Sequence, residues 1–114
     1  MKEIKAHIRP ECLERVIDRL EEAGVRNITV IRADALGAPV DNVEESARLT
    51  RKYSERYSAV AKLEIVCRGE EAERFVRITQ ENASTGLSGD GRAFITHIDR
   101  AVSSRTGAEG EEAL

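Results

Sequence analysis

The segment AKLEIVCRGEEAERFVRITQENASTGLSGDGRAFIT, residues 61–96, contains a complete strand-helix-strand pattern and indicates the fold of the chain. Residues 61–67 are rich in β-branched side chains, and apolar and polar positions alternate, which is typical of a strand. Residues 70–86 carry small and apolar side chains at helical spacing and end at a glycine. Residues 92–96 again have the pattern of a strand.

An earlier part of the chain repeats this order. Ile4, Ala6 and Ile8 alternate with polar residues and predict a strand, and a helix then begins at Pro10 and runs to about residue 23. Residues 28–33 predict the next strand. Two such units form a split pair, which is typical of an α+β, ferredoxin-like βαββαβ sandwich. We therefore expect a four-stranded antiparallel sheet with two helices on one face.

The face of the sheet opposite the helices is predicted to be partly apolar. Strand alternation directs Thr29 and Ile31, and also Lys62, Glu64 and Val66, away from the helices. An exposed face with apolar positions on so small a domain suggests self-association. Polar groups such as Thr29 and Glu64 would then lie near a subunit boundary, where a ligand could bind.

The composition excludes several classes of protein. The chain has 114 residues, and its 18 basic and 21 acidic side chains give a net charge of −3 without a basic stripe, so we expect one domain spanning residues 1–114 and no nucleic-acid partner. No apolar run is long enough to insert into a membrane, and no signal peptide precedes the first strand, so we expect a cytoplasmic protein. Cys12 and Cys67 have no metal-ligand spacing and are expected to be reduced thiols.

Residues 84–92, STGLSGDGR, form a glycine-rich link between the second predicted helix and the last strand. Because glycine adopts positive φ freely, Gly89, Asp90 and Gly91 can form a concavity whose amides point at one oxyanion, with Arg92 adding full charge. A second basic, glycine-containing stretch, residues 103–107, could close the same pocket. The alternative is that the run is only a helix stop and a tight turn.

The connection over residues 36–59 is too long for an ordinary link in a compact domain. Residues 43–58 contain neither Gly nor Pro and follow a capping-box pattern, so they predict a short helix or a partner-docking arm. The alternative is a solvated, charged helix that only connects two strands.

Four of these stretches together resemble the PII signal-transduction family: Ile8-Arg9-Pro10, the strand Lys62–Val66, Thr85-Gly86 with Gly89–Arg92, and Arg105-Thr106-Gly107 with the tail through Leu114. The resemblance implies a homotrimer with the sheets at its centre and the helices outside. It also implies ATP, ADP or AMP in each cleft between subunits, a regulatory loop at residues 36–59 that controls a partner protein, and a C-terminal tail at residues 106–114.

The resemblance implies nucleotide-binding roles for Thr29, Gly37, Glu64, Val66, Gly89, Asp90, Gly91, Arg92, Ser103 and Arg105. Of these, Thr29, Glu64 and Val66 match positions that surround the adenine, and the run that ends at Arg92 matches the phosphate cradle, with arginine where lysine is usual. Ser103 stands where the family has a second tail arginine, and this loss should weaken polyphosphate binding by about 1 kcal/mol or more.

The chain also departs from the family pattern. Ala35 and Leu36 replace a glycine and an aromatic residue before the loop. The glutamine that holds Mg²⁺ and 2-oxoglutarate in nitrogen-sensing members is missing, because the only glutamine is Gln80. These departures indicate a divergent subgroup with an atypical T-loop, and they leave sensing of 2-oxoglutarate and a role for Mg²⁺ open. The partner-binding loop residues are predicted to be Arg48, Arg51, Tyr53 and Tyr57. The implied partner is a membrane transporter or a metabolic enzyme.

The sequence gives weaker support to two other functions, a metal-related sensor and an enzyme. A metal-related sensor would use His7, Cys12, Cys67 and His97, but no pair has ligand spacing, and no metal site is predicted. An enzyme would need an acid-base pair beside the cradle, where Asp90 has no histidine nearby in sequence, so no catalytic residue is predicted. A binding module without nucleotide-dependent switching is the remaining alternative.

Overall fold

The computed structural model describes residues 1–36 and 57–114. Its strands are β1 (Lys2–Ile8), β2 (Thr29–Leu36), β3 (Tyr57–Cys67) and β4 (Arg92–His97). Its helices are α1 (Leu13–Glu22) and α3 (Ala72–Ala83), each preceded by a 3-10 turn, η1 (Pro10–Cys12) and η2 (Gly69–Glu71), and a further turn, η3 (Gly110–Ala113), lies in the C-terminal tail.

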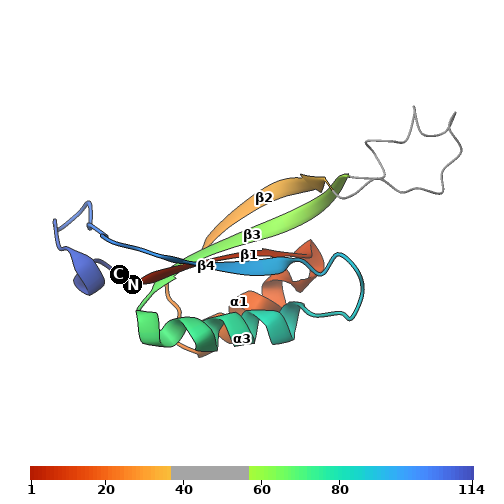
Figure 1. The fold of residues 1–114 in the computed structure, drawn as a ribbon, viewed down its shortest axis with the longest axis horizontal. Helices are drawn as coiled ribbons and strands as arrows, with labels where there is room; N and C mark the ends of the chain where they lie inside the picture. The colour runs from red at the N-terminus through yellow and green to blue at the C-terminus, as the bar shows by residue number, and fades with distance from the viewer. Residues whose placement is uncertain (37–56) are drawn as a thin grey trace, which may run out of the picture.

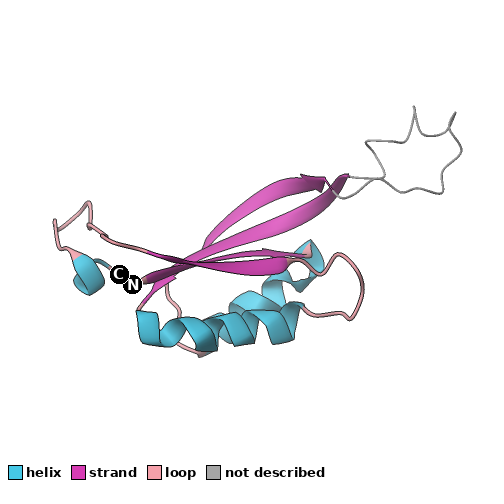
Figure 2. Cartoon of the chain, viewed as in Figure 1, coloured by secondary structure: helices cyan, strands magenta, loops and turns pink. Residues whose placement is uncertain are grey.

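The four strands form one antiparallel sheet in the order β2-β3-β1-β4, so β2 and β4 are its two edges. Both helices lie against one face of this sheet (Figures 1 and 2). The register pairs Thr29 with Glu64, Glu3 with Val66, and His7 with Arg92. The predicted ferredoxin-like α+β fold is confirmed, and the figures show the predicted two-layer arrangement.

The core lies between the sheet and the helices. Strand alternation determines which residues enter it, because every second residue of β1 and β3 faces the helices. Burial also selects one stripe of each helix, including Val16 and Leu20 of α1 and Phe75 of α3. The buried apolar residues are Ile4, Ala6, Ile8, Cys12, Val16, Leu20, Val25, Ala61, Leu63, Ile65, Cys67, Ala72, Phe75 and Ala83. The faces predicted for residues 61–67 are confirmed, and both cysteines are free and buried.

The helix ends follow local chemistry with one difference. Pro10 opens the first helical segment, and Gly24 ends it at a φ of +102°, as predicted. The second helix was expected to continue to Gly86, but α3 ends at Ala83, and Ser84 is extended with a ψ of 124°. The reason is that the amide of Gly86 donates to the carboxylate of Asp90 rather than to a helical carbonyl.

The hairpin of β2 and β3 is longer than predicted and projects past the helices (Figure 1). Its pairing extends to Leu36 and Tyr57, so both ends of the connection predicted at residues 36–59 are strand. The helix predicted for residues 43–58 is therefore wrong at its last two residues, Tyr57 and Ser58, which are strand. Pairing with β2 outweighs their weak local preference for helix. All of β2 is exposed, and Val30, which was predicted to face inward, is 40% exposed because no helix covers it.

Among residues 1–36 and 57–114, no helix has the length and apolar character needed to cross a membrane.

Candidate functional site

The glycine-rich loop, residues 84–91, joins α3 to β4 at the end of the sheet where β1 runs into α1 (Figure 1). Gly86, Gly89 and Gly91 have φ angles of +79°, +93° and +94°, which residues with a Cβ rarely adopt. A Cβ on Gly91 would also lie 1.8 Å from the carbonyl oxygen of His7. The prediction that these glycines are needed for their backbone conformation is confirmed.

The carboxylate of Asp90 points back into the loop and holds it closed. Its oxygens accept hydrogen bonds from the amide of Thr85 at 2.7 Å, from the amide of Gly86 at 3.0 Å and from the hydroxyl of Thr85. The two donors of Thr85, followed by the guanidinium of Arg9 and the amide of Gly86, hold the pKa of Asp90 well below its usual range. Asp90 is therefore a carboxylate whose acceptors are occupied by its own loop.

Arg9 is a residue of this site that the sequence reasoning gave no role. It lies between β1 and η1, where its Nε donates to Asp90 Oδ1 at 3.0 Å and its Nη2 donates to the carbonyl oxygen of Ser88 at 2.7 Å. The two residues are 81 positions apart in the chain. No periodicity or spacing connects positions so distant, and only the sheet topology places them together.

The remaining donors of the loop suit an anion. Within the part of the chain that the structure describes, the amides of Ser88, Gly89 and Asp90 donate to no protein group. Arg92 follows directly and contributes a full positive charge at the edge of the sheet. A cavity of about 360 Å³ adjoins the loop and is lined by residues of β1, α3, the loop and the start of β4, including Asp90, Gly91 and Arg92. Free amides beside a guanidinium are the donor set that phosphate or carboxylate oxygens require.

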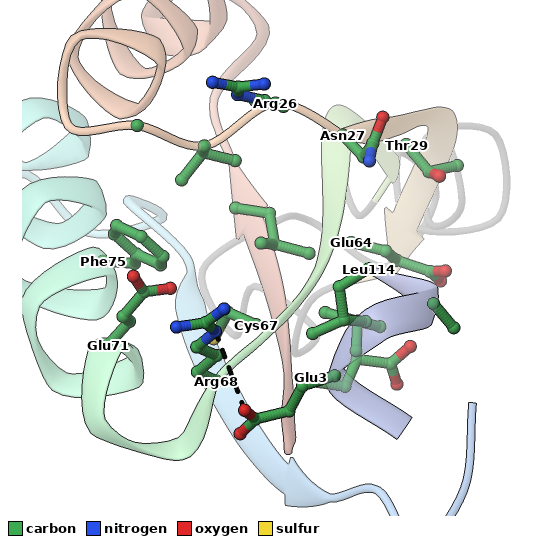
Figure 3. A pocket seen from close by; sticks show the side chains of 16 residues that line it. Glu3, Arg26, Asn27, Thr29, Glu64, Cys67, Arg68, Glu71, Phe75 and Leu114 are labelled. Carbon is green, nitrogen blue, oxygen red and sulfur yellow. Dashed lines mark ion pairs between the residues drawn. The ribbon is translucent and has the colours of Figure 1, made fainter. Parts of the chain in front are cut away.

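A second cavity, of about 410 Å³, contains the predicted adenine-contacting residues Thr29, Glu64 and Val66 (Figure 3). Its walls also come from the turn after α1, from α3 and from the C-terminal tail, and they include Arg26, Asn27, Phe75 and Leu114. Four carboxylates, from Glu3, Glu64, Glu71 and Glu111, line this cavity beside aliphatic groups, so it suits an uncharged heterocycle better than a polyphosphate. The residues that strand alternation brought together thus share one pocket.

Other charged or ionisable side chains of this cavity include Arg68, Glu111 and Cys67. Arg68 contacts Glu111 of η3 at 3.7 Å, the ion pair marked by the dashed line in Figure 3. Burial, followed by the charge of Glu71, raises the pKa of the Cys67 thiol, so this thiol is held in its protonated form.

The predicted tail residues Ser103 and Arg105 lie at the other end of the molecule from the glycine-rich loop (Figure 1). There the tail folds back on itself, because Val102 pairs with Glu109 and the Ser103 amide donates to Ala108 O at 2.8 Å. Residues 103–107 therefore do not close the pocket of the glycine-rich loop within one protomer. Strand β4 separates the two, because it begins at the loop and ends before the tail.

Several predicted residues have no described surroundings. Gly37, Arg48, Arg51 and Tyr53 lie outside the described residues, and Tyr57 is the first residue of β3. Among the described residues, no group of three or more His, Cys, Asp or Glu side chains is placed to hold a metal ion. The roles of the loop residues remain predictions.

Comparison with known proteins identifies the family. A sequence profile described as "Nitrogen regulatory protein P-II" matches residues 1–108. The chain belongs to the P-II family. It is 40% identical over 114 residues to nitrogen regulatory protein P-II 2 of Methanothermobacter thermautotrophicus, covering 100% of this chain and 97% of that protein. It is 34% identical to nitrogen regulatory protein P-II of Azospirillum brasilense over 116 residues, with full coverage of both.

The P-II fold is also found by structural comparison. The crystal structure of Arabidopsis thaliana PII bound to citrate matches with a TM-score of 0.81 and 26% sequence identity, covering 99% of this chain and 91% of that one. The recognition of the family from four short stretches is therefore confirmed, and the chain is a member of a family of nitrogen regulatory proteins.

Proposed function

We propose that the protein is a homotrimeric P-II regulator that binds ATP, ADP or AMP in the clefts between subunits and controls a partner protein through residues 36–59. The proposal makes it a signalling protein without catalytic activity of its own. The protein acts in the cytoplasm, and its partner is a membrane transporter or a metabolic enzyme. Whether Mg²⁺ accompanies the nucleotide stays open.

The observation that carries the proposal is the separation of two complementary half-sites. The glycine-rich loop adjoins the edge strand β4, whereas Thr29 begins the opposite edge strand β2. Neighbouring strands lie about 4.8 Å apart, so the two edges are about 14 Å from each other. If the loop edge of one copy meets the β2 edge of the next, a single nucleotide contacts a phosphate cradle on one copy and a base pocket on the other.

The exposed face of the sheet supports self-association. Ile31, Val66 and Phe94, which lie on the face away from the helices, are 39%, 36% and 46% exposed. Apolar side chains gathered on one face of so small a domain favour burial against further copies. In such an assembly the β2–β3 hairpin, which projects past the helices, is well placed to present the connection to a partner.

Calorimetry with ATP, ADP and AMP tests nucleotide binding. Arg105→Ala should weaken ATP binding about tenfold, the usual worth of a charge-assisted hydrogen bond, because it removes the remaining tail arginine. The Arabidopsis relative was solved with citrate, so citrate serves as a competing anion in the same titrations. Absence of binding to all three nucleotides would overturn the sensor function, and a stable monomer in light scattering would overturn the trimer.

A binding module that docks on its partner regardless of nucleotide is the second candidate. The long connection favours it as much as it favours a switch. Pull-downs of the partner with and without ATP separate the two, because a regulator requires different affinities for the partner in the two states.

A further inference from the structure

We propose that Arg9 and Asp90 are positioning residues that fix the shape of the glycine-rich loop and set its charge for an anionic ligand. Neither the Asp90 carboxylate nor the Arg9 Nε touches that ligand. The inference rests on the proposed function for the identity of the ligand. It concerns how the loop is prepared before any ligand arrives.

The Asp90 carboxylate accepts hydrogen bonds from an unusually large number of donors. Four groups converge on Asp90: the amide and hydroxyl of Thr85, the amide of Gly86 and the Nε of Arg9. These bonds connect Thr85 and Gly86, at the start of the loop, to Asp90 near its end. A carboxylate saturated by three donors of its own loop and by Arg9 has little capacity left to accept from a ligand or to coordinate a cation. Its function is therefore to close the loop.

Arg9 holds the loop at two points. Its guanidinium bonds to the Asp90 carboxylate and to the Ser88 carbonyl through two different nitrogens, at 3.0 and 2.7 Å. The Arg9 side chain is 27% exposed and that of Asp90 is 22% exposed, so solvent screens this pair only in part. A planar fork that grips two points fixes the loop relative to β1, which the single ammonium of a lysine cannot reproduce.

The same ion pair also sets the charge beside the free amides of the loop. A free carboxylate beside the amides of Ser88 and Gly89 would repel an incoming phosphate. Arg9 offsets the charge of Asp90, and its Nη1 also lies 3.9 Å from the exposed carboxylate of Glu11, so Arg92 at the start of β4 supplies the positive charge beside the loop. Closing the loop with Asp90 also uses the amides of Thr85 and Gly86 and leaves those of Ser88 and Gly89 for the ligand. Shape and charge are thus set by the same ion pair.

Hydrogen exchange of the ligand-free protein tests the positioning role directly. In Arg9→Gln, the Thr85 and Gly86 amides should exchange about tenfold faster than in the wild type, and in Arg9→Lys by a smaller factor, because lysine keeps the charge and loses the fork. Arg15→Gln is the matched control. Arg15 donates to the Asn82 carbonyl at 2.6 and 2.9 Å near the end of α3 and does not contact the loop. Unchanged exchange of both amides in Arg9→Gln and Arg9→Lys would overturn the proposal.

Ligand binding provides the second readout. Arg9→Gln should weaken ATP binding about tenfold and leave adenosine binding unchanged, because adenosine has no phosphate to place in the loop. Asp90→Asn should weaken ATP binding equally with and without Mg²⁺. A loss that appears only with Mg²⁺ would make Asp90 a metal ligand and overturn its positioning role. If the wild type binds no nucleotide, the proposed function fails, and hydrogen exchange still decides whether Arg9 and Asp90 shape the loop.

Discussion

The two ends of the sheet carry irregular, glycine-containing segments that are held in different ways. At one end, the glycine-rich loop is tied by a partly buried carboxylate with four donors and by an arginine from a distant part of the chain. At the other end, the tail after β4 is held by short backbone turns and by ion pairs of exposed side chains, Arg68 with Glu111 and Arg100 with Glu109.

The glycine-rich loop is therefore held more firmly than the C-terminal tail that lines the second cavity. Exposed ion pairs contribute little to stability, whereas a saturated carboxylate fixes every group that donates to it. The loop therefore offers its free amides in a fixed arrangement. The tail contributes Glu111 and Leu114 to the wall of the second cavity and holds them weakly, so this wall can adapt to what the cavity contains.

The strongest test of the comparison replaces one glycine at each end. Gly91→Ala should lower the free energy of unfolding by about 3 kcal/mol or more, because positive φ and a clash with the His7 carbonyl add together. Gly107→Ala should cost only about 1 to 2 kcal/mol, since its φ is +73° but a Cβ there meets nothing within 4 Å. Urea unfolding of both variants measures the difference. Equal losses would mean that the loop is no more tightly placed than the tail.

A weaker effect is expected from acid. The pKa of Asp90 is depressed, so its bonds contribute stability that is fully present above its ordinary value of 3.8 and lost as the pH falls through the lower folded value. The amide shifts of Thr85 and Gly86, followed by NMR, should therefore stay constant from pH 7 to about pH 4. They should move only at lower pH. A titration of both amides centred at or above the ordinary value would show that the loop is not held by an ionised, saturated carboxylate.

The smallest effect belongs to the tail. Glu111→Gln removes the partner of Arg68, and the two side chains are 51% and 56% exposed, so the loss of unfolding free energy should stay below about 1 kcal/mol. Faster hydrogen exchange should be confined to residues 110–114, while the exchange of the Thr85 amide stays unchanged. A loss well above that figure in urea unfolding would make the tail as firmly held as the loop.

Local sequence patterns predicted the buried residues of the core, but they did not predict the length of the hairpin at the β2 edge of the sheet. The alternation in residues 61–67 identified the buried face of β3, and Gly24 identified the end of the first helix, because both depend on neighbouring residues alone. The extra length of the β2–β3 hairpin was missed. Its outer residues, such as Ser58, have low strand preference and are strand only because a partner strand pairs with them.

Some features of the candidate site could likewise be predicted from local sequence, and others could not. The positive φ angles at Gly89 and Gly91 could be predicted, since only glycine adopts them readily. The sequence also placed Thr29 and Glu64 on one face by strand alternation, and the register pairs them directly. Residues 103–107 do not close the pocket of the glycine-rich loop within one protomer, because β4 carries the chain to the opposite end of the molecule, which nothing local indicates.

The sequence by itself determined the order of helices and strands along the chain, the buried faces of β1, β3 and both helices, and the need for glycine in the loop, since these follow from side-chain period and backbone sterics. Only the tertiary structure decided that Arg9 meets Asp90 and that Thr29 and the glycine-rich loop adjoin opposite edges of the sheet. The physical reason is that strand order and register bring together residues far apart in sequence. No local preference encodes such long-range contacts.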